Sequence, residues 1–230
     1  MYKVFAITVT LAVCFANSAQ AAIIFSDDFS AVGSGTGFSD NWSAGTISGG
    51  EITVGNTTSY RTFTSAIDTT SMDFWLSAKV TVTGSTSGWA GLSFFRGTDE
   101  DLFFGSDGGS SNWEFDTDST SDQTSTVANF TGVETHLVAH VVHNSIDMWI
   151  DPVDTSSPTA LGASDKSYSA DDVTTDDTWT RLRIGTNRTI VVNDMTAATT
   201  YAEAVPEPSS FAIGLLGLVS LGLIGRRRKR

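Results

Sequence analysis

The stretch Phe74-Trp75-Leu76-Ser77-Ala78-Lys79-Val80-Thr81-Val82, residues 74–82, alternates apolar and polar side chains with a period of two. An extended chain would carry Leu76, Ala78, Val80 and Val82 on one face and Ser77, Lys79 and Thr81 on the other. A period of two is typical of a β-strand that is buried on one face only. We therefore predict a half-buried strand here.

Similar runs flank this stretch on both sides, and turns rich in Gly, Ser, Asn and Asp separate them. They cover residues 23–29, 51–54, 60–67, 89–96, 101–104, 112–115, 136–143, 146–150, 178–184 and 189–192. No run of a dozen residues between them has helical periodicity, which argues against parallel βαβ units. The Ser-, Thr- and Asp-rich stretches 116–126 and 154–178 are expected to be exposed loops. The pattern predicts an all-β fold, a two-sheet antiparallel sandwich.

Length and composition narrow the class of protein. The chain has 230 residues, with 13 Lys and Arg, 26 Asp and Glu, one Cys and four Pro, and its net charge is −13. This length suits one large domain with short appendages, and the composition excludes collagen, long disorder and a disulfide-stabilised scaffold. Nucleic acids are bound through clustered Lys and Arg, and the only such cluster is residues 226–230. We therefore expect no nucleic-acid partner.

Residues 1–21 have the features of a secretory signal peptide. Met1-Tyr2-Lys3 is basic, residues 4–16 are almost all apolar, and Ala19-Gln20-Ala21 is a small-x-small site whose Ala19 and Ala21 predict cleavage. A membrane anchor is the alternative, but this apolar run is shorter than the roughly 20 residues that a spanning helix needs. Lipidation at Cys14 is a second alternative. Cleavage after Ala21 would leave a mature chain without cysteine.

The other end of the chain has a stop-transfer pattern. Val205-Pro206-Glu207-Pro208-Ser209-Ser210 precedes the apolar run 211–225, and Arg226, Arg227, Arg228, Lys229 and Arg230 follow it. Terminal positive charges resist translocation, so the preceding chain is expected to lie outside the inner membrane. Fifteen helical residues span only about 22 Å, less than a hydrocarbon core of about 30 Å. The short hydrophobic helix therefore suits transient anchoring in the inner membrane.

The order of Pro206-Glu207-Pro208, an apolar helix and a basic tail resembles the PEP-CTERM sorting signal of Gram-negative bacteria. The resemblance covers residues 205–230. It implies that an exosortase-type enzyme processes the protein and that the protein reaches the cell envelope, cell surface or extracellular matrix. Carriers of this signal are associated with exopolysaccharide and biofilm matrix. An ordinary C-terminal anchor would explain the helix and the arginines but not the Pro-Glu-Pro tripeptide.

The body of the chain is more acidic than the whole. Residues 22–205 contain seven Lys and Arg against 25 Asp and Glu, a net charge of −18. Such a surface stays soluble and repels anionic polymers unless divalent cations bridge them. Calcium-dependent contact with an extracellular polysaccharide is therefore a hypothesis to test.

The body also resembles a known family through several short packing and turn patterns. These are Asp27-Asp28-Phe29, residues 91–95, 102–105 and 135–140, Met148-Trp149-Ile150-Asp151-Pro152, and residues 181–186. Together they are similar to the concanavalin A-like lectin/glucanase jelly roll in its laminin G-like form. The resemblance implies a jelly-roll sandwich over residues 22–195. Residues 196–204 are predicted from their sequence to be a short linker to the sorting signal. It also implies a habit of binding glycans or proteins, but it fixes no activity.

Some jelly rolls of this superfamily are glycosidases with a Glu-x-Asp-x-Glu signature, in which one carboxylate is the nucleophile and another the acid/base. The nearest match here is Glu114-Phe115-Asp116-Thr117-Asp118. The last acid is one methylene shorter than Glu, and the departure falls at the acid/base position. We therefore expect no enzyme and no catalytic residue, and a diverged glycoside hydrolase stays as the alternative.

Metal-binding patterns are weak. On a strand, His136 and His140 would share one face and His143 the other, without a carboxylate or cysteine to complete a zinc site. Candidate calcium ligands are Asp27 and Asp28, residues 99–101, residues 116–122, and Asp171, Asp172, Asp176 and Asp177. The third group begins like an EF-hand loop but lacks its glycine and its bidentate glutamate. We expect no other cofactor, and Ca²⁺ stays open.

Two tryptophans are candidates for glycan contacts, because aromatic rings stack on sugars while neighbouring carboxylates accept hydroxyl hydrogen bonds. Trp149 alternates with Asp147 and Asp151 on one predicted face, and Trp179 shares a face with Arg181 and Arg183. The candidate glycan-binding residues are therefore Trp149, Asp147, Asp151 and Trp179. In the competing interpretation, Trp149 packs beneath a crossing loop and Trp179 supports an arginine through a cation–π contact.

The sequence thus predicts an exported, non-catalytic β-sandwich with a structural or adhesive role and an affinity for glycans. A calcium-stabilised protein-interaction module is a further alternative to the diverged hydrolase. Paired carboxylates in a groove would favour the hydrolase, whereas a groove lined by aromatic rings would favour the binding protein.

Overall fold

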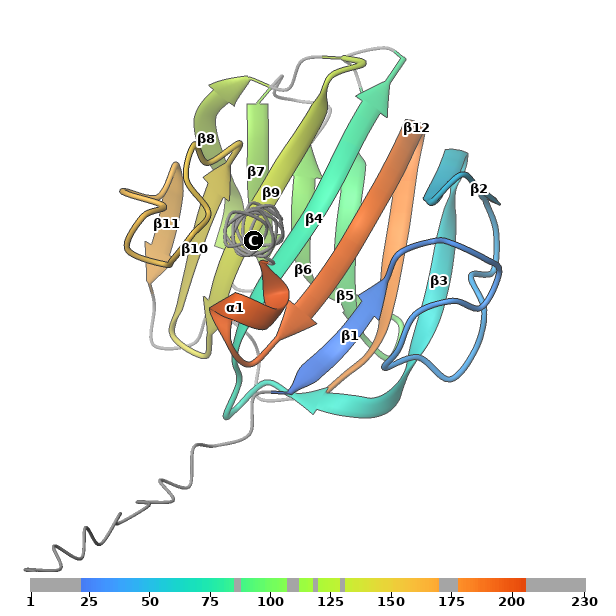
Figure 1. The fold of residues 1–230 in the computed structure, drawn as a ribbon, viewed down its shortest axis with the longest axis horizontal. Coiled ribbons are helices and arrows are strands. Elements are labelled where there is room, and N and C mark those ends of the chain that lie inside the picture. Colours follow the sequence, from blue (N-terminus) through green and yellow to red (C-terminus); the bar gives the residue numbers. More distant parts are fainter. Residues whose placement is uncertain are drawn as a thin grey trace, which may run out of the picture.

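The computed structural model describes residues 22–84, 88–106, 112–117, 120–128, 131–169 and 178–205. The predicted signal peptide and the residues of the sorting signal after 205, including its apolar run and basic tail, lie outside these ranges. Within them no helix is long and apolar enough to span a membrane. The structure of the body is built almost entirely from strands (Figure 1).

Twelve strands and one helical turn make up the described part. They are β1 (Ile23–Asp27), β2 (Thr46–Ser48), β3 (Glu51–Asp68), β4 (Asp73–Thr83), β5 (Ala90–Arg96), β6 (Asp99–Ser106), β7 (Asn112–Thr117), β8 (Thr120–Ala128), β9 (Glu134–Val142), β10 (Ser145–Ile150), β11 (Lys166–Ser169), β12 (Thr178–Ala198) and α1 (Tyr201–Ala204). All the strand pairs among them are antiparallel. The predicted all-β antiparallel fold is confirmed.

The strands form two layers that share β3 and β12. The first layer has the order β8-β7-β6-β5-β12-β3 and uses the first half of β12, residues 178–186. The second layer has the order β11-β10-β9-β4-β12 and uses the second half, residues 189–198, against β1 and the start of β3. Figure 1 looks onto the second layer, with β5, β6 and β7 behind it.

A bulge makes the corner at which the two long strands pass from one layer to the other. Asn187 and Arg188 of β12 face the single residue Asn56 of β3, because the register shifts between Thr186 and Thr189. Asn56 has a φ of 43°, a left-handed conformation that Asn adopts more readily than most residues. Strands that switch sheets through bulges or bends are one way to close a β-sandwich.

The core lies between the two layers and takes alternate residues of each strand. In β4 the five residues Phe74, Leu76, Ala78, Val80 and Val82 are all buried in it, as the alternation predicts. Aromatic rings fill one end of the core, where Phe94 packs against other rings with centroid distances from 4.5 to 6.3 Å. The half-buried strand predicted at residues 74–82 is therefore confirmed.

Two stretches expected to be loops contain strands. Residues 116–126 include most of β8, and residues 154–178 include β11. Both strands lie at the outer edges of their layers in the strand order. An edge strand rich in Ser and Thr can pair through its backbone without alternating apolar side chains, so its sequence resembles a loop.

The predicted linker 196–204 is also ordered in the structure. β12 continues to Ala198, and α1 packs on the outer face of the second layer. Tyr201 and Val205 are buried in a second apolar cluster with Trp149, and the Tyr201 hydroxyl donates to the Thr155 carbonyl at 3.1 Å. The folded body therefore extends to residue 205, because α1 and Val205 bury apolar side chains, such as Trp149, on the outer face of the second layer.

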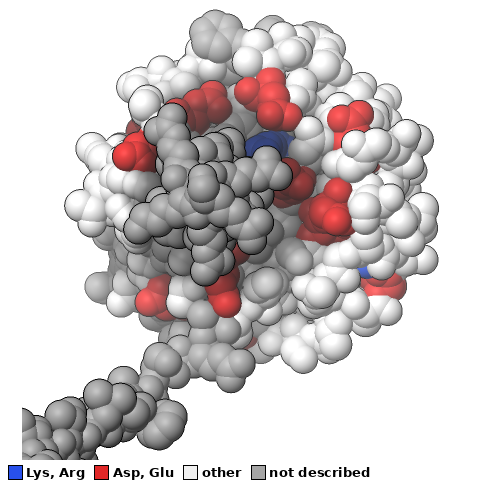
Figure 2. Space-filling model, in the orientation of Figure 1, with Lys and Arg blue, Asp and Glu red and all other residues white. Residues whose placement is uncertain are grey.

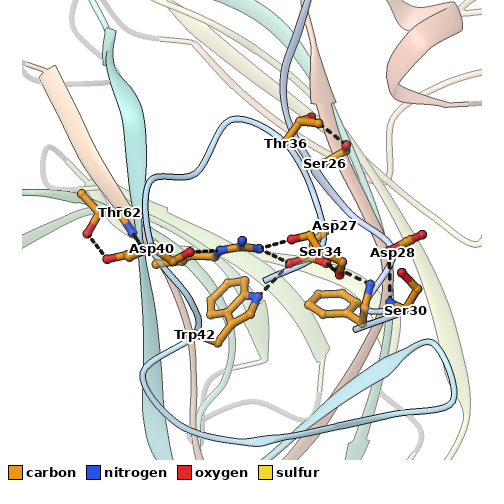
Figure 3. Close-up of polar contacts among 11 residues, drawn as sticks. Ser26, Asp27, Asp28, Ser30, Ser34, Thr36, Asp40, Trp42 and Thr62 are labelled. Carbon is orange, nitrogen blue, oxygen red and sulfur yellow. Dashed lines mark hydrogen bonds and ion pairs between the residues drawn. The ribbon is translucent and has the colours of Figure 1, made fainter. Parts of the chain in front are cut away.

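A buried ion pair fixes the loop that follows β1 (Figure 3). Asp27 is only 2% exposed, and its carboxylate accepts hydrogen bonds from the Trp42 indole at 2.9 Å, the Ser34 hydroxyl at 2.7 Å and the Phe29 amide at 2.9 Å. It also forms an ion pair with Arg61 of β3. One carboxylate thus ties β1, the loop and β3 together, and this holds the loop against the second layer.

Candidate functional site

A pocket of about 560 Å³ opens on the outer face of the second layer, beside α1. Figure 2 shows this face, where acidic side chains gather around a hollow that also has a patch of basic surface. This volume lies within the range of about 300–1,000 Å³ that is usual for small-molecule sites. The pocket is therefore large enough for a ligand such as a sugar unit.

Four hydroxyl groups form the floor of the pocket, in a row that crosses the strands. Ser26 of β1 pairs with Thr36 on one side and with Thr196 of β12 on the other, and Thr196 pairs with Ser77 of β4. All four line the pocket, and the Ser26 and Thr36 hydroxyl oxygens are 3.1 Å apart. We call these four residues the hydroxyl row. Each hydroxyl can both donate and accept a hydrogen bond.

The position of Thr36 depends on the glycines on either side of it. Gly35 has a φ of 92° and Gly37 a φ of 82°, both in the left-handed region that favours glycine. A Cβ atom at Gly37 would lie 2.1 Å from the Ile24 carbonyl oxygen. Only a residue without a side chain lets this loop lie directly on β1, and so Thr36 is held next to Ser26.

Charged groups stand at the wall of the pocket. Lys79 of β4 forms an ion pair with Asp194 at 3.2 Å, and Asp28, directly after β1, also lines the pocket. Asp194 occupies a bulge in β12 between Asn193 and Met195 and has a φ of 39°. The bulge turns the Asp194 carboxylate outward, where most of it is exposed. The wall therefore offers one ammonium donor and two carboxylate acceptors.

His136 of β9 completes the pocket. One of its ring nitrogens, Nε2, lies 2.9 Å from the Ser77 hydroxyl, and its backbone amide donates to Asp151 at 2.7 Å. Burial lowers the pKa of His136, and the positive charge of Lys79 lowers it further, against the opposing effect of Asp151 and Glu134. The lowered pKa favours the neutral imidazole, which can donate or accept a hydrogen bond.

We expect the stability of the protein to fall below pH 6.5 because of His136. Its pKa in the folded state is lower than the ordinary value of 6.5, so the unfolded chain takes up a proton first as the pH decreases. Stability is then lost from about pH 6.5 down to the folded-state pKa. NMR titration of the imidazole should give a midpoint below 6.5, and the replacement His136→Gln should flatten the stability profile over this range. A midpoint at or above 6.5 would contradict the assignment.

The tryptophans predicted to contact glycans are covered in the structure. Trp149 lies on the outer face with Asp147, opposite Ile146, as predicted, but α1 and the loop carrying Leu161 cover it. It is 8% exposed, and its indole donates to the Gly162 carbonyl at 3.2 Å. The competing interpretation, a tryptophan beneath a crossing loop, describes this position. A ring buried in this way has no free face for a sugar.

Trp179 lies in the core, on the opposite face from the one predicted. The pairing of β12 with β3 is irregular between Trp179 and Arg181, so strict alternation is lost there. Trp179 faces the core although Arg181, two residues later, faces outward. Trp179 is 0% exposed, packs against Phe94 at 4.5 Å and donates from its indole to Asp101. It therefore supports the core rather than an arginine, because the irregular pairing between Trp179 and Arg181 leaves the ring facing inward.

The carboxylates next to the predicted tryptophans have structural partners. Asp147 accepts a hydrogen bond from the Ser164 hydroxyl at 3.1 Å, and Asp151 accepts one from the His136 amide. Asp151 has a φ of 48° at the end of β10. Both groups hold turns of the second layer, and neither lines the pocket.

The hydrolase-like acidic run is not open to a substrate. Glu114 is 1% exposed, and its carboxylate accepts a hydrogen bond from Thr124 at 3.1 Å. Asp116 is partly exposed on the same strand, and Asp118 lies outside the described residues. A buried glutamate beside an edge strand cannot reach a glycosidic bond, so this run does not support the alternative of a diverged hydrolase.

Several candidate calcium ligands in the described ranges form ion pairs or hydrogen bonds with other side chains. Asp27 pairs with Arg61, Glu100 pairs with Arg183, and Asp101 accepts from Trp179. Over the described ranges, no group of three His, Cys, Asp or Glu side chains is placed to hold a metal ion. The run 171–177 falls outside these ranges, and calcium binding stays a prediction.

Sequence reasoning missed the hydroxyl row because its members come from distant parts of the chain. Alternation did predict that Ser77 and Lys79 point outward from β4, and that His136 lies on a strand. Nothing local marks Ser26, Thr36 or Thr196 as their neighbours. Only the strand order, which inserts the end of β12 between β1 and β4, places them in one row.

A family model for the PEP-CTERM protein-sorting motif matches residues 204–229. The chain therefore carries this motif, within one residue of the predicted bounds at each end. The motif indicates export and association with the cell envelope or surface of a Gram-negative bacterium. No curated protein matches the sequence.

Two solved structures share the fold of the body. The sialidase of Trypanosoma rangeli matches with a TM-score of 0.55 and 12% identity, over 79% of this chain and 32% of the sialidase. The CBM2 module of the evolved Dit of Lactobacillus casei BL23 phage J-1 matches with a TM-score of 0.51 and 9% identity, over 77% of this chain and 95% of the module. The chain thus spans less than a third of the sialidase. At these identities the likeness shows the β-sandwich fold alone.

Proposed function

We propose that this envelope-sorted protein is a non-catalytic module that binds an extracellular polysaccharide in the pocket of the second layer. The sorting motif indicates an exported protein that an exosortase-type enzyme processes. The body then carries the binding function outside the inner membrane. Polysaccharide binding at the cell envelope or surface would give the protein an adhesive role in the extracellular matrix.

The observation that carries the proposal is the hydroxyl row with its charged wall. A sugar ring presents several hydroxyl groups, and each can donate to a carboxylate or accept from an ammonium group. Asp28 and Asp194 supply the acceptors, Lys79 supplies a donor, and the floor supplies groups that can do either. A ligand with many hydroxyl groups can therefore form hydrogen bonds with the hydroxyl row, Lys79 and both carboxylates, and leaves no buried charge without a partner.

The charge state of the pocket favours binding over glycoside hydrolysis. A general acid for glycosidic cleavage needs a raised pKa so that it is protonated near neutral pH. Hydrogen bonds from the Ser30 amide and hydroxyl lower the pKa of Asp28 instead. Asp194 is exposed and forms an ion pair with Lys79 at 3.2 Å, so its carboxylate already accepts from an ammonium group. Asp28 is therefore placed as an acceptor rather than an acid, and Asp194 stands as an acceptor beside Lys79.

The pair formed by Ser77 and His136 has the spacing of a nucleophile and its base, but its setting differs from that of a hydrolase. Ser77 lies in the middle of β4, paired with Val138 on one side and Thr196 on the other. A hydrolase also needs free N–H donors to hold a developing oxyanion. The sheet backbone around Ser77 is used for strand pairing, so we assign the pair to ligand binding.

We expect Thr196→Val to weaken binding of the best neutral glycan by about five- to tenfold, since one net hydrogen bond is worth about 1 kcal/mol. Valine keeps the shape of threonine and removes only the hydroxyl from the centre of the row. A glycan array should first identify the ligand, and calorimetry should then compare the variants. The matched control is Thr81→Val, which removes an outward hydroxyl from β4 beyond the pocket lining. Equal affinity of Thr196→Val and the unmodified protein, or no glycan bound at all, would refute the proposal.

A further inference from the structure

The outer face of the first layer, on the other side of the sandwich from the pocket, carries two stacked arginines. Arg181 and Arg183 are two residues apart on β12 and point away from the core, which takes Leu182 and Ile184. The Arg181 guanidinium carbon lies 4.7 Å from the ring centroid of Tyr60 and 5.0 Å from that of Phe95. Cation–π contacts of this kind hold a guanidinium plane in a fixed orientation.

Arg183 is paired, whereas Arg181 is not. Arg183 donates to the Glu100 carboxylate at 2.6 Å and to the Ser93 hydroxyl at 2.8 Å. Arg181 has no hydrogen bond or ion pair with any described residue, and its Nε atom is buried without a partner. Both carboxylate oxygens of Asp40 instead accept from Thr62, the strand partner of Arg181, at 2.7 and 2.6 Å. The donors of Arg181 that remain available to a ligand are therefore those of its two terminal nitrogens, Nη1 and Nη2, which have no partner among the described residues.

This arrangement leaves a local positive charge on a strongly acidic protein. The two guanidinium groups share the ring of Phe95, since Arg183 lies 4.8 Å from its centroid, and Glu100 compensates only one of them. A partly buried cation without a partner is unfavourable, and so is a second cation beside it. An anion from outside the chain would relieve both effects.

We propose that Arg181, with Arg183 beside it, binds the carboxylate of an acidic sugar. The planar fork of a guanidinium matches a carboxylate in a bidentate pair, and its orientation is already set by the stacked rings. Tyr60 is partly exposed next to it and offers a ring face to the apolar side of a sugar. The ligand class is therefore a uronate-containing oligosaccharide.

This site is separate from the pocket and does not depend on it. Arg181 belongs to the half of β12 in the first layer, and Thr196 belongs to the half in the second layer. Two sites on opposite faces would let one molecule contact two polysaccharide chains. Such bivalent contact is a way to crosslink a matrix without a tight single site.

The test uses trigalacturonate as the acidic probe and maltotriose as a neutral probe of the same length. We expect Arg181→Gln to weaken trigalacturonate binding about tenfold or more, since hydrogen bonds to charged groups are worth at least about 1.5 kcal/mol. Arg181→Lys keeps the charge but loses the planar fork, so it should also bind more weakly. The matched control is Lys166→Gln, which removes one positive charge from β11. Melting curves should show that all three variants are folded.

A direct readout separates binding from a general charge effect. The Nε–H resonance of Arg181 in an NMR spectrum should shift on addition of trigalacturonate and stay unchanged with maltotriose. Thr81→Val, which lies outside both sites, should bind trigalacturonate as the unmodified protein does. Unchanged affinity in Arg181→Gln, an equal loss in Lys166→Gln, or no binding of trigalacturonate would overturn the assignment.

Discussion

Replacement of Asp27 by alanine is expected to lower the free energy of unfolding by about 3–5 kcal/mol. The change leaves the guanidinium of Arg61, which is 3% exposed, without its counter-ion inside the sandwich. It also removes the acceptor for the Trp42 indole, the Ser34 hydroxyl and the Phe29 amide. A loss of this size is a large part of the 5–15 kcal/mol that stabilises a typical domain.

Urea unfolding followed by tryptophan fluorescence would measure the loss in Asp27→Ala. The matched control is Asp28→Ala, because Asp28 is exposed and its hydrogen bonds come from Ser30 and Ser34 within its own loop rather than from a buried ion pair. The control should change stability by less than about 1 kcal/mol. Asp27→Asn keeps one acceptor oxygen and removes the charge, so it should lie between them. Equal stability of Asp27→Ala and Asp28→Ala would show that the buried ion pair does not hold the loop.

The second large effect is expected at Gly37, where alanine should destabilise the protein by about 3 kcal/mol or more. The Cβ atom would lie 2.1 Å from the Ile24 carbonyl oxygen and 2.7 Å from the Cα atom of Phe25. Both atoms belong to the backbone of β1, so no side chain can rotate away to make room. The positive φ of 82° adds strain of its own.

Gly49→Ala is the control that separates the two causes at Gly37. Gly49 has a φ of 68°, but a Cβ atom there would meet nothing within 4 Å. Its replacement should therefore show the conformational strain alone, about 1 kcal/mol. Urea unfolding of both variants gives the difference, which is the contribution of close contact with β1. Similar losses in both variants would mean that the loop moves aside at little cost.

The Gly37 variant also connects stability with binding. Gly35 and Gly37 hold Thr36, the first residue of the hydroxyl row, beside Ser26. If Gly37→Ala folds at low temperature, displacement of this loop should weaken glycan binding in the pocket. The loop between β1 and β2 thus serves both the packing of the sandwich and the shape of the site.

The sequence by itself determined the class of fold and the destination of the protein. The alternation in β4 predicts which of its side chains are buried, because a period of two is a local property of an extended chain. The sorting motif can likewise be recognised in one short contiguous segment, which consists of Pro206-Glu207-Pro208 and the apolar and basic runs that follow. Both conclusions need no knowledge of which strands are neighbours.

Only the tertiary structure decided which outward side chains are accessible and which of them meet. Trp149 faces outward as the alternation predicts, yet α1 covers it, and irregular pairing between β12 and β3 leaves the ring of Trp179 in the core. Ser26 and Ser77 meet through Thr196, more than a hundred residues later in the chain. Coverage, bulges and strand order depend on long-range pairing, which is set by the packing of the whole sandwich rather than by any local pattern.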